Sequence, residues 1–305
     1  MFRFILIRIV QSIFTLLVLS VVVFFGAEMT GDQALVLATA DTTLEELEAI
    51  RVNLGLDKPA YVRYGDYLWD AVRGDLGMSG SQRRSVSEML IERVPATLQL
   101  AAAGLLVAMS IGIPLGILAA VKYNTIFDKF AKAFAVIGMS APQFWVAIML
   151  IFLFGAKWGV LPTFGKGGID HYILPAFAIS LFIMAGFMRL TRSSMLEVLD
   201  SEFVKFARIK GLNERLVIYK HALKNAIIPV LTFGGVSFAG LLNGAIVVEV
   251  VFAWPGLGRM MLDSIRQRDT DVILATILVS GLLYIVMSTI VDILYAYVDP
   301  RIRFG

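Results

Sequence analysis

The sequence of 305 residues contains no cysteine and few charges: Asp, Glu, Lys and Arg make up 17% of it, and 58% is hydrophobic. An average soluble domain has about 25% charged and about 45–50% apolar residues. The lack of charge excludes a soluble globular enzyme and a disordered chain, and the lack of cysteine excludes a disulfide scaffold. The net charge is only +3 despite 27 Lys and Arg residues, so nucleic-acid binding has no electrostatic basis.

Three kinds of catalytic site are also missing. A nucleotide-binding loop needs Gly-x-x-x-x-Gly-Lys followed by Ser or Thr, and the nearest match, 160–167, ends in Gly167. With only two histidines, His171 and His221, and no cysteine, we expect no zinc site. The apolar stretches contain no histidine to activate a serine, which disfavours an intramembrane Ser–His protease. We expect no cofactor in this chain and no enzymatic activity of its own.

Long apolar runs are abundant. A bilayer core of about 30 Å needs about 20 apolar helical residues, and a central charge costs about 2.5–3.5 kcal/mol. Little polar sequence remains to cover such runs, which disfavours the alternative of core helices in a large soluble protein. Arg189 and Arg192 are expected to extend the short fourth run by snorkelling to the membrane surface. The six runs are Ile9–Ala27, Ala96–Val121, Ala133–Ala156, Tyr172–Met188, Ala226–Val248 and Val272–Val291.

The first run follows Arg3 and Arg8, as in a secretory signal peptide, but it exceeds the 7–15 apolar residues typical of one. The small-residue pattern 38–40 lies too far beyond it for cleavage, so we predict an uncleaved span. With the N-terminus in the cytoplasm, inside segments carry 15 Lys and Arg residues and the two short outside loops carry five. Because cytoplasmic loops are enriched in these residues, we predict that both termini are cytoplasmic.

The predicted fold class is an all-α membrane protein with six transmembrane helices. Residues 1–27 form an N-terminal segment with the first span, and 28–95 form a small extracytoplasmic cap. Residues 96–305 form a five-helix transmembrane core with a cytoplasmic loop at 193–225. Within the cap, Leu44–Leu54 and Tyr61–Val72 have helical periodicity.

No span carries a charged residue near its middle, where a proton- or sodium-coupled pump usually keeps one. This absence indicates that the energy for transport enters elsewhere. The alternative is an ion bound by polar groups alone, such as Gln99, Ser110 and Asn243.

Glycine and proline recur within the spans. Gly112 and Gly116 have the small-xxx-small spacing that lets helices approach closely. Pro114 and Pro142 are expected to kink or loosen their helices. Together these residues permit a bundle that moves, although ordinary helix packing would explain each one singly.

Eight of the fifteen inside Lys and Arg residues lie between 189 and 224, within and just before the cytoplasmic loop. Asp200 or Ser201 can cap a helix, and Glu202 favours its positive N-terminal end. Gly211 is a good residue for the position just after the helix end. The loop therefore predicts one short helix of about 10 residues, a turn at 212–213 and a second helix leading into the fifth span.

Phe203, Phe206 and Ala207 follow helical spacing and are expected on one face of the short helix, with Lys205, Arg208 and Lys210 in its C-terminal half. Three interpretations compete: a helix on anionic lipid, a structural linker, and an element that docks into a partner. Periodicity alone favours the first.

The loop also carries a family resemblance. Residues 207–212 (Ala-Arg-Ile-Lys-Gly-Leu) and 221–229 (His-Ala-Leu-Lys-Asn-Ala-Ile-Ile-Pro) resemble the cytoplasmic signature of ABC importer inner-membrane permeases of the dipeptide/oligopeptide branch. The chain departs from the family at Thr30 and Gln33, which replace prolines, and at Ile209, which replaces a small residue. Further matches, which extend the resemblance over essentially the whole chain, lie at 31–32, 54–59, 74–77, 247–259 and 299–303.

The resemblance implies a mechanism. The loop helix would dock into a groove on a cytoplasmic ATPase, with Phe203 and Phe206 as the buried anchor. The small Ala207 and the Gly211 turn would suit a helix gripped closely by that partner. ATP-driven closure would then rock the spans between inward-open and outward-open states. The predicted ATPase-coupling residues are Glu202, Phe203, Phe206, Ala207, Lys210 and Gly211.

The resemblance further implies the partners and location. Two cytoplasmic ATPase subunits or domains would hold ATP and Mg²⁺, a second homologous permease would complete a heterodimer, and an extracytoplasmic binding protein would deliver the solute. The chain would lie in the cytoplasmic membrane of a bacterium or archaeon. Peptides are the commonest cargo of this branch, and nickel, glutathione and oligosaccharides are alternatives.

Two other function classes stay open on the residues alone. A membrane enzyme acting on lipid or protein would be active as the isolated chain. An autonomous channel or secondary carrier would move solute through liposomes without ATP.

Overall fold

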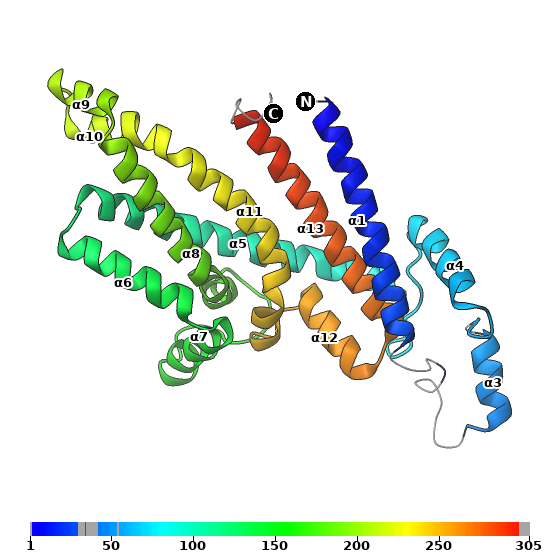
Figure 1. Cartoon of the computed structure of the whole chain (residues 1–305). Coiled ribbons are helices and arrows are strands. Elements are labelled where there is room, and N and C mark those ends of the chain that lie inside the picture. Colours follow the sequence, from blue (N-terminus) through cyan, green and yellow to red (C-terminus); the bar gives the residue numbers. More distant parts are fainter. Residues whose placement is uncertain (1, 30–33, 35–41, 54, 299–305) are drawn as a thin grey trace. The chain divides into compact units, whose positions relative to one another are not determined.

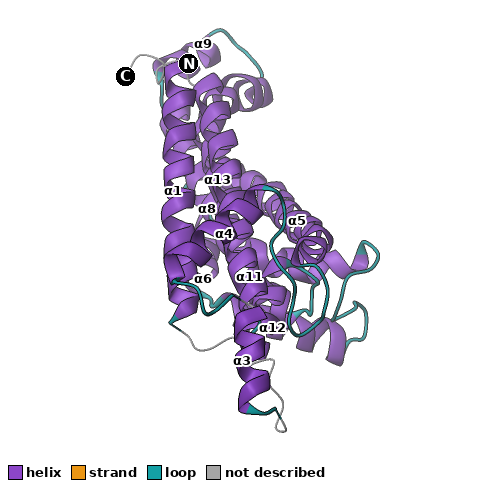
Figure 2. Cartoon of the chain, turned by 90° about the vertical axis from the view of Figure 1, so that its right-hand side faces the viewer, coloured by secondary structure: helices purple, strands orange, loops and turns teal. Residues whose placement is uncertain are grey.

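The computed structural model describes residues 2–29, 34, 42–53 and 55–298. Within these residues the chain is helical, with no strand and only an isolated antiparallel bridge between Met78 and Ser85 (Figures 1 and 2). The predicted all-α fold class is confirmed. The family matches at 31–32 and 299–303, Leu54, and the departures at Thr30 and Gln33 lie outside the described residues.

The helices in chain order are α1 (Phe2–Glu28), α3 (Leu44–Asn53), α4 (Ala60–Val72), α5 (Val86–Val121), α6 (Ile126–Ser140), α7 (Gln143–Leu150), the π-helix η1 (Ile151–Lys157), α8 (Asp170–Leu199), α9 (Glu202–Ile209), α10 (Glu214–Leu216), the π-helix η2 (Val217–Ala222), α11 (Leu223–Val251), α12 (Leu257–Gln267) and α13 (Thr270–Val298).

Five of the predicted spans lie in long, apolar helices: α1, α5, α8, the segment from α10 to α11, and α13. The helical periodicity at 44–54 and 61–72 is also confirmed, by α3 and α4. α5 continues through Pro114. Whether the termini are cytoplasmic and 28–95 is extracytoplasmic stays a prediction.

The third span differs from a single straight helix. Its sequence forms α6 and then α7 with η1, and the two parts meet at 104°. The break falls at Ala141, which is extended (φ −72°, ψ 124°) just before Pro142. Proline clashes with a helical residue before it and has no N–H for the helix, so the bend follows from the predicted effect of Pro142. The count of six spans holds when this bent pair is taken as one.

The chain divides into two compact units. One comprises 1–97 and 255–285, and the other comprises 98–254 and 286–305. In the first unit, the start of α5 packs against α12 and α13 through a core whose buried members are Val86, Met89, Leu90, Leu257, Met260, Val272 and Ala275.

A buried carboxylate ties the segment before α5 to the turn between α12 and α13, within the first unit. Asp269 accepts hydrogen bonds from the hydroxyls of Ser79 (2.6 Å) and Ser81 (2.7 Å) and from the Ser81 N–H (3.0 Å). Burial opposes ionisation of Asp269, but these hydrogen bonds prevail and hold its pKa below the usual value. Part of the predicted cap is therefore fastened to the loop that precedes the last span.

In the second unit, α5 and α8 approach closely at the predicted glycine pair. A Cβ on Gly112 would lie 2.6 Å from the Met184 carbonyl oxygen, and one on Gly116 would lie 2.6 Å from that of Met188. Only glycine fits at such distances from backbone atoms. The small-xxx-small pattern thus brings the two helices together, as expected.

Candidate functional site

The candidate site is α9 with the turn and helices that follow it. Figure 1 shows α9 and α10 beyond the C-terminal end of α8, joined to α11 through η2. Ser201 stands at the N-cap position, but its hydroxyl donates to the Val198 carbonyl instead of accepting from the helix. The acidic Glu202 lies in the first turn, where it favours the positive end of the helix.

The inner face of α9 packs on its own chain. Val204 and Ala207 are buried in one cluster with Ile117 of α5, Met195 of α8 and Val217 of η2. This corrects the expectation that Ala207 shares a face with Phe203 and Phe206. Val204 and Ala207 are three residues apart and form the inner stripe, which rotates both phenylalanines outward. The small size of Ala207 therefore serves close packing within this chain.

The outer face of α9 presents aromatic side chains. Phe203 is 48% exposed and Phe206 is 57% exposed. The Lys210 ammonium lies 4.7 Å from the centre of the Phe206 ring, a cation–π contact. Aromatic residues, phenylalanine among them, are enriched at protein interfaces.

The helix ends at Gly211 in the predicted way. Gly211 has φ +75°, which favours glycine, and its N–H donates to the Arg208 carbonyl (2.9 Å). The Leu212 N–H donates to the Ala207 carbonyl (3.4 Å), which completes a Schellman motif. The turn at Leu212 and Asn213 follows, and Asn213 caps α10 by accepting from the Arg215 N–H.

Ion pairs hold the two sides of this turn together. The Arg208 guanidinium bonds both carboxylate oxygens of Glu214, at 2.7 and 3.2 Å. This bidentate geometry fixes α9 against α10. Hydrogen bonds from Lys205 to Asp200 and then to Glu202 raise the pKa of the Lys205 ammonium.

The conformation of Gly211 yields a graded prediction. A Cβ there would meet no atom within 4 Å, so Gly211→Ala costs only left-handed backbone strain, about 1–2 kcal/mol. Gly211→Asn should cost less, because asparagine tolerates this conformation. Gly211→Pro loses the bond to Arg208 and cannot adopt a positive φ. We expect thermal midpoints of the purified chain to fall in the order Gly, Asn, Ala, Pro.

If α9 couples the spans to an ATPase, as the family resemblance implies, Gly211→Pro should also abolish ATP-driven transport while membrane insertion persists. Insertion is measured by the amount of chain that stays in the membrane fraction after an alkaline wash. A proline variant that melts and transports like the parent would contradict the role of this turn.

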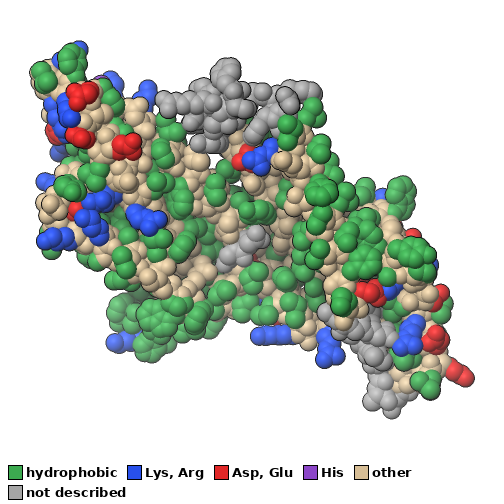
Figure 3. Space-filling model, viewed as in Figure 1, with side chains coloured by type: hydrophobic (Ala, Val, Ile, Leu, Met, Phe, Trp, Pro, Cys, Tyr) green, Lys and Arg blue, Asp and Glu red, His purple; other side chains and the backbone are tan. Residues whose placement is uncertain are grey.

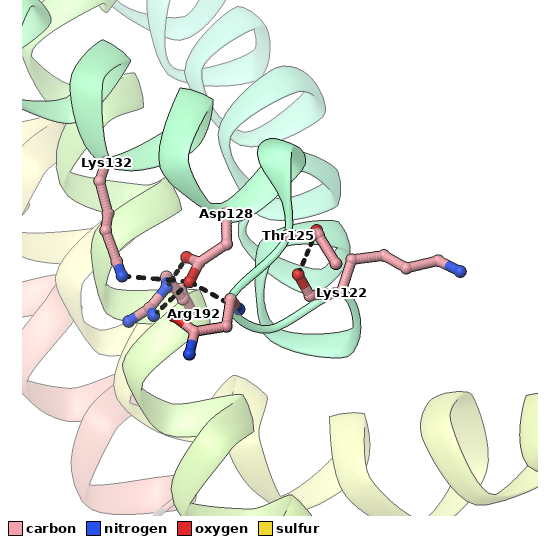
Figure 4. Close-up of polar contacts among 6 residues, drawn as sticks. Lys122, Thr125, Asp128, Lys132 and Arg192 are labelled. Atoms are coloured by element: carbon pink, nitrogen blue, oxygen red, sulfur yellow. Dashed lines mark hydrogen bonds and ion pairs between the residues drawn. The ribbon is translucent and has the colours of Figure 1, made fainter.

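A buried ion pair lies between α6 and α8 (Figure 4). The fully buried Asp128 carboxylate accepts from Arg192 Nε (2.6 Å) and Nη2 (3.0 Å) and from the Asn124 N–H (3.1 Å). Lys132 Nζ lies 3.1 Å away, and the Arg192 guanidinium also stacks 5.7 Å from the Tyr123 ring centre. The sequence predicted that the Arg192 side chain would snorkel to the membrane surface. In the structure the buried Asp128 carboxylate holds this side chain instead.

Sequence reasoning missed the ion pair of Asp128 with Arg192. The only local signal was the Asp128–Lys132 spacing of four on a helix, which ordinarily marks an exposed pair. Its main partner is 64 residues away in the sequence. Among the described residues, no group of three His, Asp or Glu side chains is placed to hold a metal ion.

Comparison with known proteins decides the family. Residues 112–304 match the family model of the binding-protein-dependent transport system inner membrane component, and residues 1–101 match that of its N-terminal part. The chain belongs to this family. The resemblance inferred from the loop is confirmed, and the chain is a multi-pass inner-membrane permease of the ABC importer class.

Relatives of this permease include proteins named glutathione transport system permease protein GsiC. Those of Escherichia coli strain K12 and Shigella dysenteriae serotype 1 are each 40% identical over 305 residues, covering all of both chains.

Two solved ABC transporter structures are similar to it. An amino acid ABC transporter crystallised with histidines has a TM-score of 0.53 at 15% identity, covering 69% of this chain and 94% of that one. The inward-facing MetNI methionine transporter has a TM-score of 0.53 at 17% identity, covering 67% and 95%. At these identities the likeness shows the shared fold alone.

Proposed function

We propose that this chain forms half of the translocation pathway of an ATP-driven peptide importer, and that α9 couples its spans to a cytoplasmic ATPase. The observation that carries the proposal is the two-sided packing of α9. Its inner face is buried against the spans, and its outer face exposes Phe203 and Phe206. The other proposed coupling residues are Glu202, Ala207, Lys210 and Gly211.

The packing of α9 provides a route for force. Val204 and Ala207 lie in one buried cluster with the ends of α5, α8 and η2. Packed interiors are close to crystal density and compress little. A displacement of α9 by its partner would therefore move the ends of these helices, which is what alternation between inward-open and outward-open states requires.

The proposed orientation places both termini and α9 in the cytoplasm. Figure 3 shows Lys and Arg side chains gathered over the end of the second unit that carries α9, α10 and the start of α6. Cytoplasmic surfaces of membrane proteins have this enrichment. Residues 28–95 would then lie on the extracytoplasmic side, toward the binding protein.

The proposed ATPase partners follow from a motif that the chain lacks, and the other proposed partners follow from its family. It has no nucleotide-binding loop, so two cytoplasmic ATPase subunits or domains would bind ATP and Mg²⁺. A second homologous permease would form the other half of the pathway as a heterodimer. An extracytoplasmic binding protein would deliver the solute and select it.

The proposed cargo is short peptides. Relatives that are 40% identical are named for glutathione transport, and glutathione is a tripeptide. Glutathione itself is the second candidate, favoured by the same observation. Nickel and oligosaccharides gain no support from these relatives.

One preparation tests the proposal. The chain, tagged at its C-terminus, is extracted from native membranes in mild detergent, and its co-purifying subunits are identified and reconstituted in liposomes. We expect a second permease, ATPase subunits and ATP-dependent uptake of peptide delivered by the binding protein. An isolated chain that moves solute without ATP would contradict it.

A matched pair of cargoes then separates the two candidates. Glutathione is compared with the α-linked tripeptide Glu-Cys-Gly, which has the same composition and a different first peptide bond. Uptake of both indicates a general peptide importer. Uptake of glutathione alone indicates a specific one.

A further inference from the structure

Within the first unit, α4 lies beside α1 and not beyond the end of α1. The hydroxyls of Ser20 and Tyr64 are hydrogen-bonded at 2.8 Å, and the Phe24 ring packs against the Tyr64 ring with centres 5.4 Å apart. Arg63 forms an ion pair with Glu28, the last residue of α1. Figures 1 and 2 both show α4 alongside the C-terminal half of α1, and α3 beyond that end.

These contacts set the depth of α4 in the bilayer. α1 has 27 residues, and at 1.5 Å per residue it is about 40 Å long, which matches a bilayer with its headgroups. Ser20 precedes Glu28 by two helical turns, about 12 Å along the axis. The headgroup layer is only about 5–8 Å thick on each side. Tyr64 therefore contacts α1 at the level of the outermost hydrocarbon.

The outward face of α4 is apolar. Tyr61, Trp69 and Val72 are 73%, 61% and 84% exposed, and with Gly65 they follow helical spacing along one stripe. Figure 3 shows hydrophobic side chains gathered over both α1 and α4. The stripe thus adjoins the exposed apolar surface of α1, which includes Val22.

A charged stripe runs next to the apolar one. Asp66, Asp70 and Arg73 are exposed at spacings of four and three residues. Asp66 pairs with Lys58 at 2.9 Å, and the Arg73 guanidinium lies 4.2 Å from the centre of the Trp69 ring. An apolar stripe beside a charged one is the pattern of a helix lying in the membrane surface, and Trp and Tyr concentrate there.

We infer that α4 is an interfacial helix whose partner is lipid, in the leaflet that holds the Glu28 end of α1. Tyr61, Trp69 and Val72 enter the acyl chains, and Asp66, Asp70 and Arg73 stay among the headgroups and water. The segment 28–95 is then divided: α4 is anchored in the membrane, and α3 lies in water.

The test uses spin labels, and the absence of native cysteine means that each variant carries a single label. Trp69→Cys is compared with the neighbouring Asp70→Cys. Val22→Cys in α1 is the lipid control, and Glu48→Cys in α3 is the water control. The full-length chain is reconstituted in vesicles of phosphatidylethanolamine and phosphatidylglycerol. Collision rates with oxygen, which partitions into lipid, and with a water-soluble nickel complex are measured.

We expect the Trp69 label to resemble Val22, with an oxygen-to-nickel ratio severalfold above that of Glu48, and the Asp70 label to lie nearer Glu48. A Trp69 label as accessible to nickel as Glu48 would overturn the inference, because the stripe would face water. A label shielded from both reagents would also overturn it, because protein would then cover the stripe.

A second measurement needs no label. Quenching of intrinsic fluorescence is measured with lipids brominated near the headgroup and with lipids brominated deep in the acyl chains. The parent is compared with Trp69→Phe, so that the difference reports Trp69 alone. We expect this difference signal to be quenched more by shallow than by deep bromines. No quenching of it would contradict the interfacial placement.

Discussion

Replacement of both Phe203 and Phe206 by Ala is expected to abolish ATP-driven transport and release the ATPase from the permease. Both side chains are largely exposed on the chain itself. They would therefore contribute to the free energy of ATPase binding and not to that of folding. Aromatic anchors of interfaces cost about 2 kcal/mol or more each when truncated. Two of them correspond to an affinity loss of about a thousandfold. Pull-down of the ATPase by the tagged permease and peptide uptake in liposomes measure the effect.

The controls separate docking from folding. Tyr219→Ala removes another exposed aromatic from the same region, in η2, and should leave ATPase binding and uptake intact. The thermal midpoint of the isolated double variant should match the parent, because neither phenylalanine is buried. Normal uptake by the double variant would rule out α9 as the coupling element.

Ala207→Arg would be a poor test of docking. Ala207 is buried against Val204 and Met195 of its own chain. An arginine there would force the inner face of α9 away from the spans and lower stability. Loss of transport in that variant would not separate misfolding from lost docking, whereas the phenylalanine variants do.

Removal of the Asp128 carboxylate is expected to give the largest loss of stability. In Asp128→Ala the Arg192 guanidinium loses its bidentate partner, and a buried pair broken on one side costs about 3–5 kcal/mol. We expect the thermal midpoint of the detergent-purified chain to fall sharply. Lys132→Ala is the matched control: Lys132 is half-exposed, so its loss should cost about 1 kcal/mol or less.

A double variant makes this prediction discriminating. Asp128→Leu with Arg192→Met replaces the pair by apolar side chains, a change that is often neutral or stabilising. The double variant should be more stable than either single variant, because each single variant leaves a lone buried charge and the double variant leaves none. If the two single costs simply add, the ion pair is not energetically coupled, and its role as the link between α6 and α8 is wrong.

The expectations that held are those that rest on local physics. Apolar run length predicted the spans because a bilayer sets a minimum length for a helix, whatever packs beside it. The glycine end of the short helix and the turn after it followed from C-terminal capping preferences that act within a few residues. The break before Pro142 and the close α5–α8 approach at Gly112 and Gly116 also follow from the geometry of single residues.

By itself, then, the sequence determined the class of protein, its spans and its loop helix, since hydropathy, capping and family motifs are local properties of the chain. Only the tertiary structure decided that Ala207 faces inward, that Arg192 meets Asp128, and that α4 lies beside α1. Each of these depends on a partner far away in the sequence. Periodicity shows that a helix has faces, but the neighbour that covers a face is chosen by packing.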